Sequence, residues 1–191
     1  MRLLNEFQKV ERTILVGHTE RLENDVEHCY QLALVAWYAV EAYRLPLNAD
    51  KVITYALLHD LVEVYAGDTY VFDKDPAVHQ SKVQREHEAL ERIKQEFPEF
   101  LQMTSIIAEY ERREDEESKF IYALDKVIAP LNIYLQGGRT WRKYQVTFDQ
   151  LMENKSPKVK AHPEVERYFL QLKEILEKEQ DQLFHKEDID K

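Results

Sequence analysis

Apolar residues in this chain of 191 residues recur mainly at intervals of three and four, which is the spacing of one face of an α-helix. Only four glycines and six prolines interrupt the pattern, which favours long helices over many short strands. The spacing predicts a loop over residues 12–23 and helices over 3–9, 24–43, 51–65, 76–96, 99–110, 114–136, 147–153 and 163–184. We therefore expect one all-α domain, a helical bundle over residues 1–185, followed by a charged, frayed tail over 186–191.

Two of the predicted helices have clear boundary signals. Asn24 stands in an N-cap position with Glu27 three residues later, as in a capping box. Gly67 is placed to end the helix that begins near residue 51. In the helix after Asn24, His28 begins the stripe of residues that should face the core, and we interpret Trp37 as a core residue too.

Charge and composition narrow the class of protein. The formal net charge of −10 repels nucleic-acid polymers and anionic membranes, so we expect neither as a partner, whereas a small phosphorylated ligand remains compatible. The sequence has no apolar run of the ~18 residues that a membrane span needs and no secretory signal at its start, which predicts a cytoplasmic protein. The single cysteine, Cys29, excludes an intrachain disulfide, and we interpret it as a buried structural thiol.

Four potential metal ligands stand within the apolar helical pattern: His28, the adjacent pair His59 and Asp60, and Asp125. Taken singly, each has an ordinary alternative, as a hydrogen-bonded core histidine, a helix-end aspartate or an ion-pair partner. Together, imidazoles and carboxylates suit a divalent cation such as Mn, Fe, Co, Ni, Zn or Mg. Adjacent helical residues diverge by roughly 100°, and a cation lying between their faces is within reach of both. The set therefore predicts a metal site with open positions for water and a substrate oxygen.

The order and the flanks of these residues resemble the HD-domain metal-dependent phosphohydrolases. Residues 21–28 (RLENDVEH) are similar to the R-x-E-N-x-x-E-H segment of the bacterial 5′-deoxynucleotidase branch of that family, and residues 123–126 (ALDK) match its late aspartate. In that branch an acid follows the histidine–aspartate pair by three positions, and a Gly-Asp comes next. This chain has Glu63 and Gly67-Asp68 in those places. The resemblance covers residues 1–136.

The resemblance implies an HD-domain helical bundle that holds one divalent cation. The implied ligands are His28, His59, Asp60 and Asp125. Glu63, which stands four residues after His59, would be the carboxylate that orients water or carries a proton.

The same resemblance implies further contacts with a substrate. Asp68 would contact the sugar or order the catalytic site, and the arginine before the first histidine helix would bind the phosphate, for which Arg12 is the candidate. His18, in the predicted loop, is another candidate contact. The branch has an aromatic residue after the arginine, whereas this chain has residues 13–15 (TIL), which leaves the choice between ribose and deoxyribose open.

The expected function is release of phosphate from (deoxy)nucleoside 5′-monophosphates by metal-activated water. Two alternatives remain: hydrolysis of a pyrophosphate-type nucleotide such as a guanosine alarmone, and a non-catalytic HD fold that senses a metal or nucleotide. The R-x-E-N segment and Glu63 favour the first function. The resemblance also implies a homodimer. We interpret His79 and His87 as solvated residues rather than ligands of a second metal, and residues 137–191 carry no assigned role.

Overall fold

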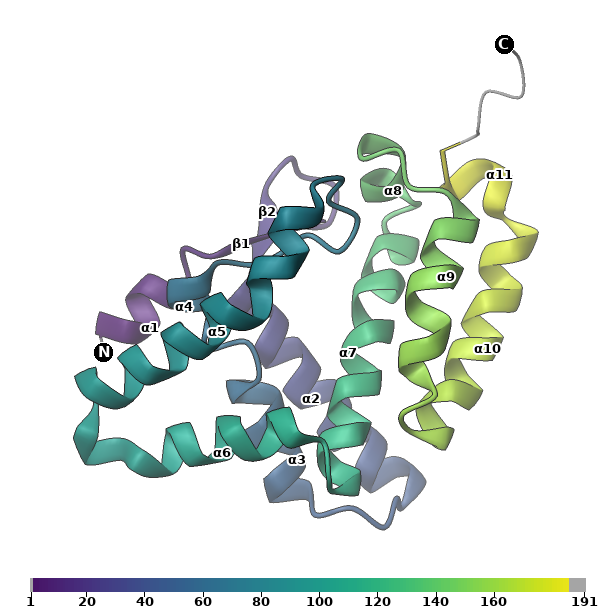
Figure 1. The fold of residues 1–191 in the computed structure, drawn as a ribbon. Coiled ribbons are helices and arrows are strands. Elements are labelled where there is room, and N and C mark those ends of the chain that lie inside the picture. Colours follow the sequence, from purple (N-terminus) through teal and green to yellow (C-terminus); the bar gives the residue numbers. More distant parts are fainter. Residues whose placement is uncertain (1, 186–191) are drawn as a thin grey trace. The chain divides into compact units, whose positions relative to one another are not determined.

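The computed structural model is predominantly helical (Figure 1). It describes residues 2–185, so the predicted tail over 186–191 lies outside the described residues. Within the described range the strands form a single two-stranded sheet, and the predicted all-α class is confirmed. The chain divides into two compact units: residues 1–13 with 22–118, and residues 14–21 with 119–191.

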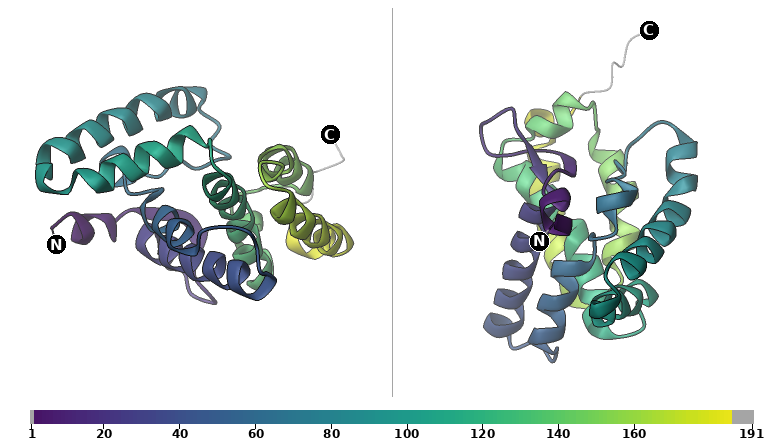
Figure 2. Two further views of the ribbon diagram at one scale, coloured as in Figure 1. Left: turned by 90° about the horizontal axis from the view of Figure 1, so that it is seen from below. Right: turned by 90° about the vertical axis from the view of Figure 1, so that its left-hand side faces the viewer.

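The first unit contains most of the helices. Its elements are α1 (Arg2–Phe7), the beginning of β1 (Glu11–Leu15), β2 (Leu22–Asn24), α2 (Asp25–Tyr43), α3 (Ala49–Leu58), α4 (Glu63–Ala66), α5 (Pro76–Glu96), the 3₁₀ turn η1 (Pro98–Phe100), α6 (Leu101–Arg112) and the start of α7 (Glu116–Leu135). Helix α2 packs against α3, and α5 packs against both α4 and α6. Helices α5 and α6 form an antiparallel hairpin around η1 (Figures 1 and 2).

The predicted loop over residues 12–23 is wrong in part, because β1 and β2 pair there as a short hairpin. The turn between the strands is closed by a hydrogen bond from Val16 N to Arg21 O of 2.9 Å. Gly17 lies in this turn with a φ of +54°, a conformation that glycine adopts at little cost. These strands are too short to show the alternation of apolar and polar residues by which a strand is recognised in a sequence. Their pairing brings Arg12 of β1 next to Glu23 of β2.

Helix α2 begins as predicted. The Asn24 side chain accepts a hydrogen bond from Glu27 N, and the Glu27 side chain accepts one from Asn24 N, so the capping box is confirmed. The interpretation of Trp37 as a core residue is wrong, because 48% of it is exposed. The buried face of α2 lies on the other side of the helix and consists of Asp25, His28, Cys29, Leu32, Ala33, Ala36 and Val40.

The predicted helix over residues 51–65 is interrupted at the histidine–aspartate pair. Helix α3 ends at Leu58, and the chain then tightens through hydrogen bonds to the third residue back, such as Leu61 N to Leu58 O at 3.1 Å. The tightened turn buries both Leu61 and Val62 in the core before α4 begins. Gly67 follows α4 with a φ of +75°, so the predicted stop at glycine is confirmed.

One hydrophobic cluster holds the first unit together. It joins side chains from α1, α2, the turn after α3, α5 and α6, so elements far apart in sequence share one core. Its buried members are Leu3, Phe7, Cys29, Leu61, Val62, Ala89, Ile93, Met103 and Ile107. The prediction of a buried thiol at Cys29 is thereby confirmed.

The second unit consists of residues 14–21, the greater part of α7, and α8 (Arg139–Lys143), α9 (Phe148–Val159), α10 (Pro163–Lys178) and α11 (Gln180–Leu183). Helix α10 packs against α9 and α11 (Figure 1). The Trp141 and Phe184 rings stack with their centroids 4.3 Å apart, which anchors the end of the described chain. None of the helices in the described part is both long and apolar enough to cross a membrane.

The capping box predicts a local stability effect. Asn24→Ala should lower the free energy of unfolding of the metal-free protein by about 1 kcal/mol, because it removes the acceptor for a backbone N–H at the start of α2. Gln102→Ala, at an exposed position of α6, is the matched control and should change it by less than about 0.5 kcal/mol. Urea unfolding of both variants tests this, and an equal effect of the two substitutions would contradict the capping role.

Candidate metal and phosphate site

Three of the predicted metal ligands come together between the start of α2 and the end of α3. The Nε2 atom of His59 lies 3.0 Å from Oδ2 of Asp60, and Nε2 of His28 lies 3.7 Å from the same oxygen. One donor atom from each of the three side chains lies within 4.8 Å of the others. Both imidazoles are buried, at 0% exposure for His28 and 4% for His59. Helix α3 ends at Leu58, so His59 and Asp60 lie in the turn directly after it, where both can approach His28.

Backbone contacts set the orientation of the His59 ring. Its Nδ1 lies 3.0 Å from the carbonyl oxygen of Ala56, which can only accept a hydrogen bond. In its neutral form, which a metal-ligating histidine needs, the ring would therefore carry its hydrogen on Nδ1 and have the lone pair of Nε2 on the side of Asp60. Burial is the largest single influence on the pKa of His59 and lowers it, but the charges of Asp60 and Cys29 and the hydrogen bonds to these two side chains together raise this pKa well above its ordinary value. The geometry therefore favours a cation at this nitrogen.

His28 has a comparable acidic neighbour on its other side. Oε2 of Glu23 lies 3.9 Å from Nδ1 of His28 and 3.4 Å from Nε of Arg12. Glu23 is itself 6% exposed, so this carboxylate is held inside the protein by the β1–β2 pairing. A carboxylate on the Nδ1 side favours a His28 ring whose Nε2 faces Asp60.

Arg12 lies directly against the histidine–aspartate pair. Its Nη1 atom is 2.9 Å from Oδ2 of Asp60 and 3.3 Å from Oδ1 of Asp25. The side chain is only 13% exposed, so these charges interact with little screening by water. The residue that the sequence nominated for binding phosphate thus stands beside the candidate metal ligands.

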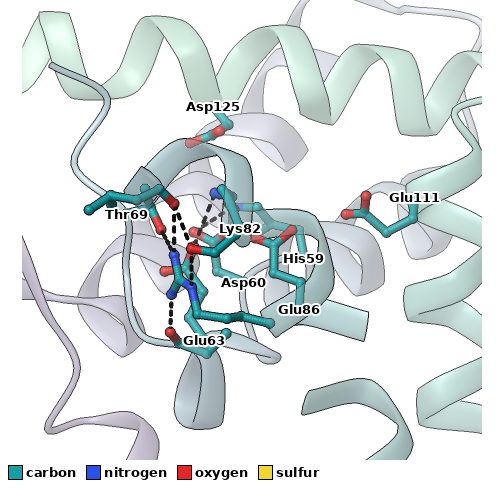
Figure 3. A network of polar contacts seen from close by, with 12 residues as sticks. His59, Asp60, Glu63, Thr69, Lys82, Glu86, Glu111 and Asp125 are labelled. Carbon is teal, nitrogen blue, oxygen red and sulfur yellow. Dashed lines mark hydrogen bonds and ion pairs between the residues drawn. The ribbon is translucent and has the colours of Figure 1, made fainter. Parts of the chain in front are cut away.

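A second group of carboxylates shares Asp60 with the histidines. Oxygen atoms of Asp25, Asp60 and Glu63 lie within 4.8 Å of one another, and Asp25 is completely buried. Burial and the Asp60 charge raise the pKa of Asp25 to about 7, while Arg12 opposes this rise. Figure 3 shows Asp60 and Glu63 in the polar network that extends from here to α5.

Glu63, the predicted acid/base residue, is 3% exposed. Burial, followed by the charges of Asp60, Asp68 and Asp25, raises its pKa well above the ordinary value for a glutamate. Asp68 is half-buried just after Gly67, and its negative charge is close enough to Glu63 to disfavour ionisation of that carboxyl group. A carboxyl group with a raised pKa is suited to accepting and returning a proton near neutral pH.

The other candidate residues from the sequence differ in burial and in their place in the fold. Asp125 is a buried residue of α7 in the second unit, where Lys126 Nζ contacts its carboxylate, and its place as the fourth ligand stays a prediction. His18 is exposed on the turn between β1 and β2, and its role also stays a prediction. His79 and His87 are exposed on α5, which agrees with their interpretation as solvated residues.

Two charged groups near this site escaped the sequence reasoning. Asp25 belongs to the segment 21–28 but was given no role of its own. Its spacing of three from His28, which puts both residues on one helical face, is the signal that could have identified it. Lys82 belongs to a helix whose sequence is mostly polar, and its Nζ lies 3.7 Å from Oε1 of Glu63. Nothing in the local pattern of α5 distinguishes this lysine from a solvated one.

The donor set fits a divalent cation. Two imidazole nitrogens and a carboxylate oxygen face one another at distances that an ion can bridge. Within the described part of the chain, Asp25 Oδ2 and Glu63 Oε2 are buried oxygens with no hydrogen-bond partner. Buried carboxylate oxygens of this kind are costly unless a positive charge offsets them. Chemistry and burial therefore both favour a bound metal ion.

Known proteins of similar sequence contain an HD domain or are named as nucleotidases. The chain matches the HD domain family over residues 4–166. It is 34% identical over 129 residues to the 5′-deoxynucleotidase HDDC2 of Mus musculus and 33% identical to that of Homo sapiens. Each match covers 66% of this chain, and the chain spans only 62% and 61% of the length of these relatives.

Solved structures show the same fold. A protein of Magnetospirillum magnetotacticum described as a predicted metal-dependent phosphohydrolase superposes with a TM-score of 0.79 at 26% identity, covering 92% of this chain and 88% of that one. A conserved hypothetical protein of Pyrococcus furiosus superposes with a TM-score of 0.61 at 17% identity, covering 93% and 96%, and shows the fold alone. Because the family match spans most of the chain, including both histidines and both aspartates of the predicted ligand set, this protein belongs to the HD domain family.

Proposed function

We propose that this protein is a metal-dependent phosphohydrolase that releases phosphate from nucleoside 5′-monophosphates, with deoxynucleotides as the first class to test. One observation carries the proposal: the Arg12 guanidinium lies 2.9 Å from the Asp60 carboxylate that also approaches both buried histidines. A cation site and a fixed guanidinium side by side suit a phosphate monoester, whose dianion needs positive charge on several oxygens. The names of the HDDC2 relatives and of the Magnetospirillum protein support the same chemistry.

In this proposal His28, His59, Asp60 and Asp125 hold one divalent cation, drawn from Mn, Co, Mg, Ni, Fe or Zn. When bound, such a cation supplies Lewis-acid chemistry and makes a water molecule more acidic. Asp60 is the central ligand, because its Oδ2 approaches both imidazoles and Arg12. Asp125 completes the set by resemblance to the family.

Arg12 binds non-bridging phosphate oxygens. In the free protein its guanidinium is held by Asp25, Asp60 and Glu23, so its position is fixed before substrate arrives. Its charge is permanent, and its planar donors match the geometry of a phosphate group. His18 is a further proposed contact with the substrate.

Glu63 is the proposed proton carrier. It takes a proton from the attacking water as the bond from that water to phosphorus forms and the bond from phosphorus to the 5′ oxygen breaks. Glu63 then gives this proton up to the departing 5′ alkoxide, which leaves as the alcohol and restores the carboxylate. Its burial and raised pKa suit this role. Asp68, which shares the electrostatic surroundings of Glu63, orders this group or contacts the sugar.

The substrate is a small nucleotide rather than a polymer, in keeping with the net charge of −10. A panel of nucleoside monophosphates, incubated with protein reloaded with Mn, Co or Mg, tests the proposal through the release of inorganic phosphate. Release from at least one monophosphate is the expected result. Release of pyrophosphate from a pyrophosphate-type nucleotide would instead support the alarmone-hydrolase alternative. A protein that contains bound metal and releases nothing would support the sensor.

Asp60→Ala should abolish metal binding, because it removes the carboxylate that both histidines approach. Addition of Mn to metal-stripped wild-type protein should raise its unfolding midpoint, since a ligand that binds only the folded state stabilises it, and should leave the Asp60→Ala midpoint unchanged. Asp50→Ala, at an exposed position of α3 just before this pair in the sequence, is the matched control and should respond like wild type. Metal analysis of the three proteins completes the test, and stoichiometric metal in Asp60→Ala would refute the ligand assignment.

A further inference from the structure

Helix α5 contributes a charged side chain to the site from outside the metal-binding motif. Lys82, on the side of α5 that faces α4, has its Nζ 3.7 Å from Oε1 of Glu63 and 3.2 Å from Oε1 of Glu86, one turn further along α5. Figure 3 shows Lys82, Glu63 and Glu86 within one polar network. Much of α5 is polar and exposed, whereas Lys82 is partly buried, with 40% of its side chain exposed, and directs its ammonium group toward Glu63.

The surroundings of Glu63 make this contact significant. Glu63 is buried among Asp25, Asp60 and Asp68, whose charges all oppose a negative charge on it. Lys82 opposes these effects and favours the ionised carboxylate of Glu63. The two carboxylates of Glu63 and Glu86 raise the pKa of Lys82 above its ordinary value, although burial alone would lower it. Lys82 therefore stays positively charged.

A second side chain of α5 holds this helix in register with the site. Arg85 donates to the carbonyl oxygen of Ala66, at the end of α4, and its Nη2 lies 2.8 Å from Oγ1 of Thr69, directly after Asp68. The same Nη2 also reaches Val78 O at 3.4 Å. These contacts tie the segment that leaves α4 to α5, so they hold the backbone of α5 beside Glu63.

We propose that Lys82 is a positioning residue for the proposed hydrolysis: its ammonium group, steadied by Glu86, offsets the charge of Glu63 and holds that carboxylate aimed at the reacting water. The inference rests on the proposed function, because it assigns Lys82 a role through Glu63. Lys82 forms no ion pair with a metal ligand or with Arg12 in the contacts described above, and the Asp60 charge acts on it only at longer range, so its loss should leave metal and phosphate binding close to wild type. This separates it from a residue that binds substrate.

Steady-state kinetics on the best monophosphate of the panel test this role. Lys82→Met should lower kcat by roughly 10- to 100-fold, the usual effect of removing a partner that orients a catalytic group, with KM and metal content close to wild type. Lys82→Arg retains the charge and should recover a large part of the lost rate. Lys94→Met is the matched control on the same helix, because Lys94 pairs with Glu91 of α5 itself, and it should leave kcat unchanged.

A double-mutant cycle tests the Lys82–Glu63 contact without any need for activity. Lys82→Met should lower the unfolding midpoint of the metal-stripped protein more in the wild-type background than in the Glu63→Gln background, because only the first leaves a buried carboxylate without its cation. If the wild-type protein releases no phosphate from any substrate, the proposed function fails, and the cycle alone then decides whether the contact exists.

Three results would overturn the inference. The first is a kcat for Lys82→Met within about twofold of wild type, well below the loss expected for an orienting partner. The second is a raised KM with unchanged kcat, which would make Lys82 a substrate-binding residue. The third is equal destabilisation by Lys82→Met in both backgrounds of the cycle. Should Lys82→Met fail to fold, Glu86→Gln replaces it, and it should lower kcat while leaving metal content unchanged.

Discussion

The site depends on how a buried group of carboxylates is offset by positive charge. Asp25, Asp60 and Glu63 bring their oxygens within 4.8 Å of one another, and such a group is strongly unfavourable inside a protein unless cations accompany it. The chain supplies Arg12 from β1 and Lys82 from α5. A divalent ion between the histidines and Asp60 would supply the rest. The carboxylates that make the site costly to bury therefore explain why it should bind a metal, and a bound metal together with Arg12 would supply the positive charge that a phosphate needs.

The break in the helix at the histidine–aspartate pair reconciles two demands on adjacent residues. Leu61 and Val62 belong to the hydrophobic cluster, whereas His59 and Asp60 must face the polar site. A tight turn with hydrogen bonds to the third residue back satisfies both demands within four residues and restarts the chain as α4 at Glu63. Local core packing thus sets the direction of the chemically important side chains.

Features that depend on neighbours in sequence could be predicted from the sequence. The capping box of Asn24 and Glu27, the stop at Gly67 and the buried thiol at Cys29 depend on local hydrogen bonds, backbone freedom or helical spacing. Features that depend on contacts between residues far apart in the sequence could not be predicted in this way. The paired strands β1 and β2 show no usable period, and Trp37 lies on the exposed side of a helix whose sequence is apolar around much of its circumference.

By itself the sequence determined the helical class, the family and the identity of the metal-ligating candidates, because these depend on spacing and on the chemistry of single side chains. Only the tertiary structure decided which charges surround them. Arg12 meets Asp60 across 48 residues of chain, and Lys82 meets Glu63 from a separate helix. Electrostatic partners act through space and across low-dielectric surroundings, so their strength depends on distance and burial, which the order of residues along the chain does not contain.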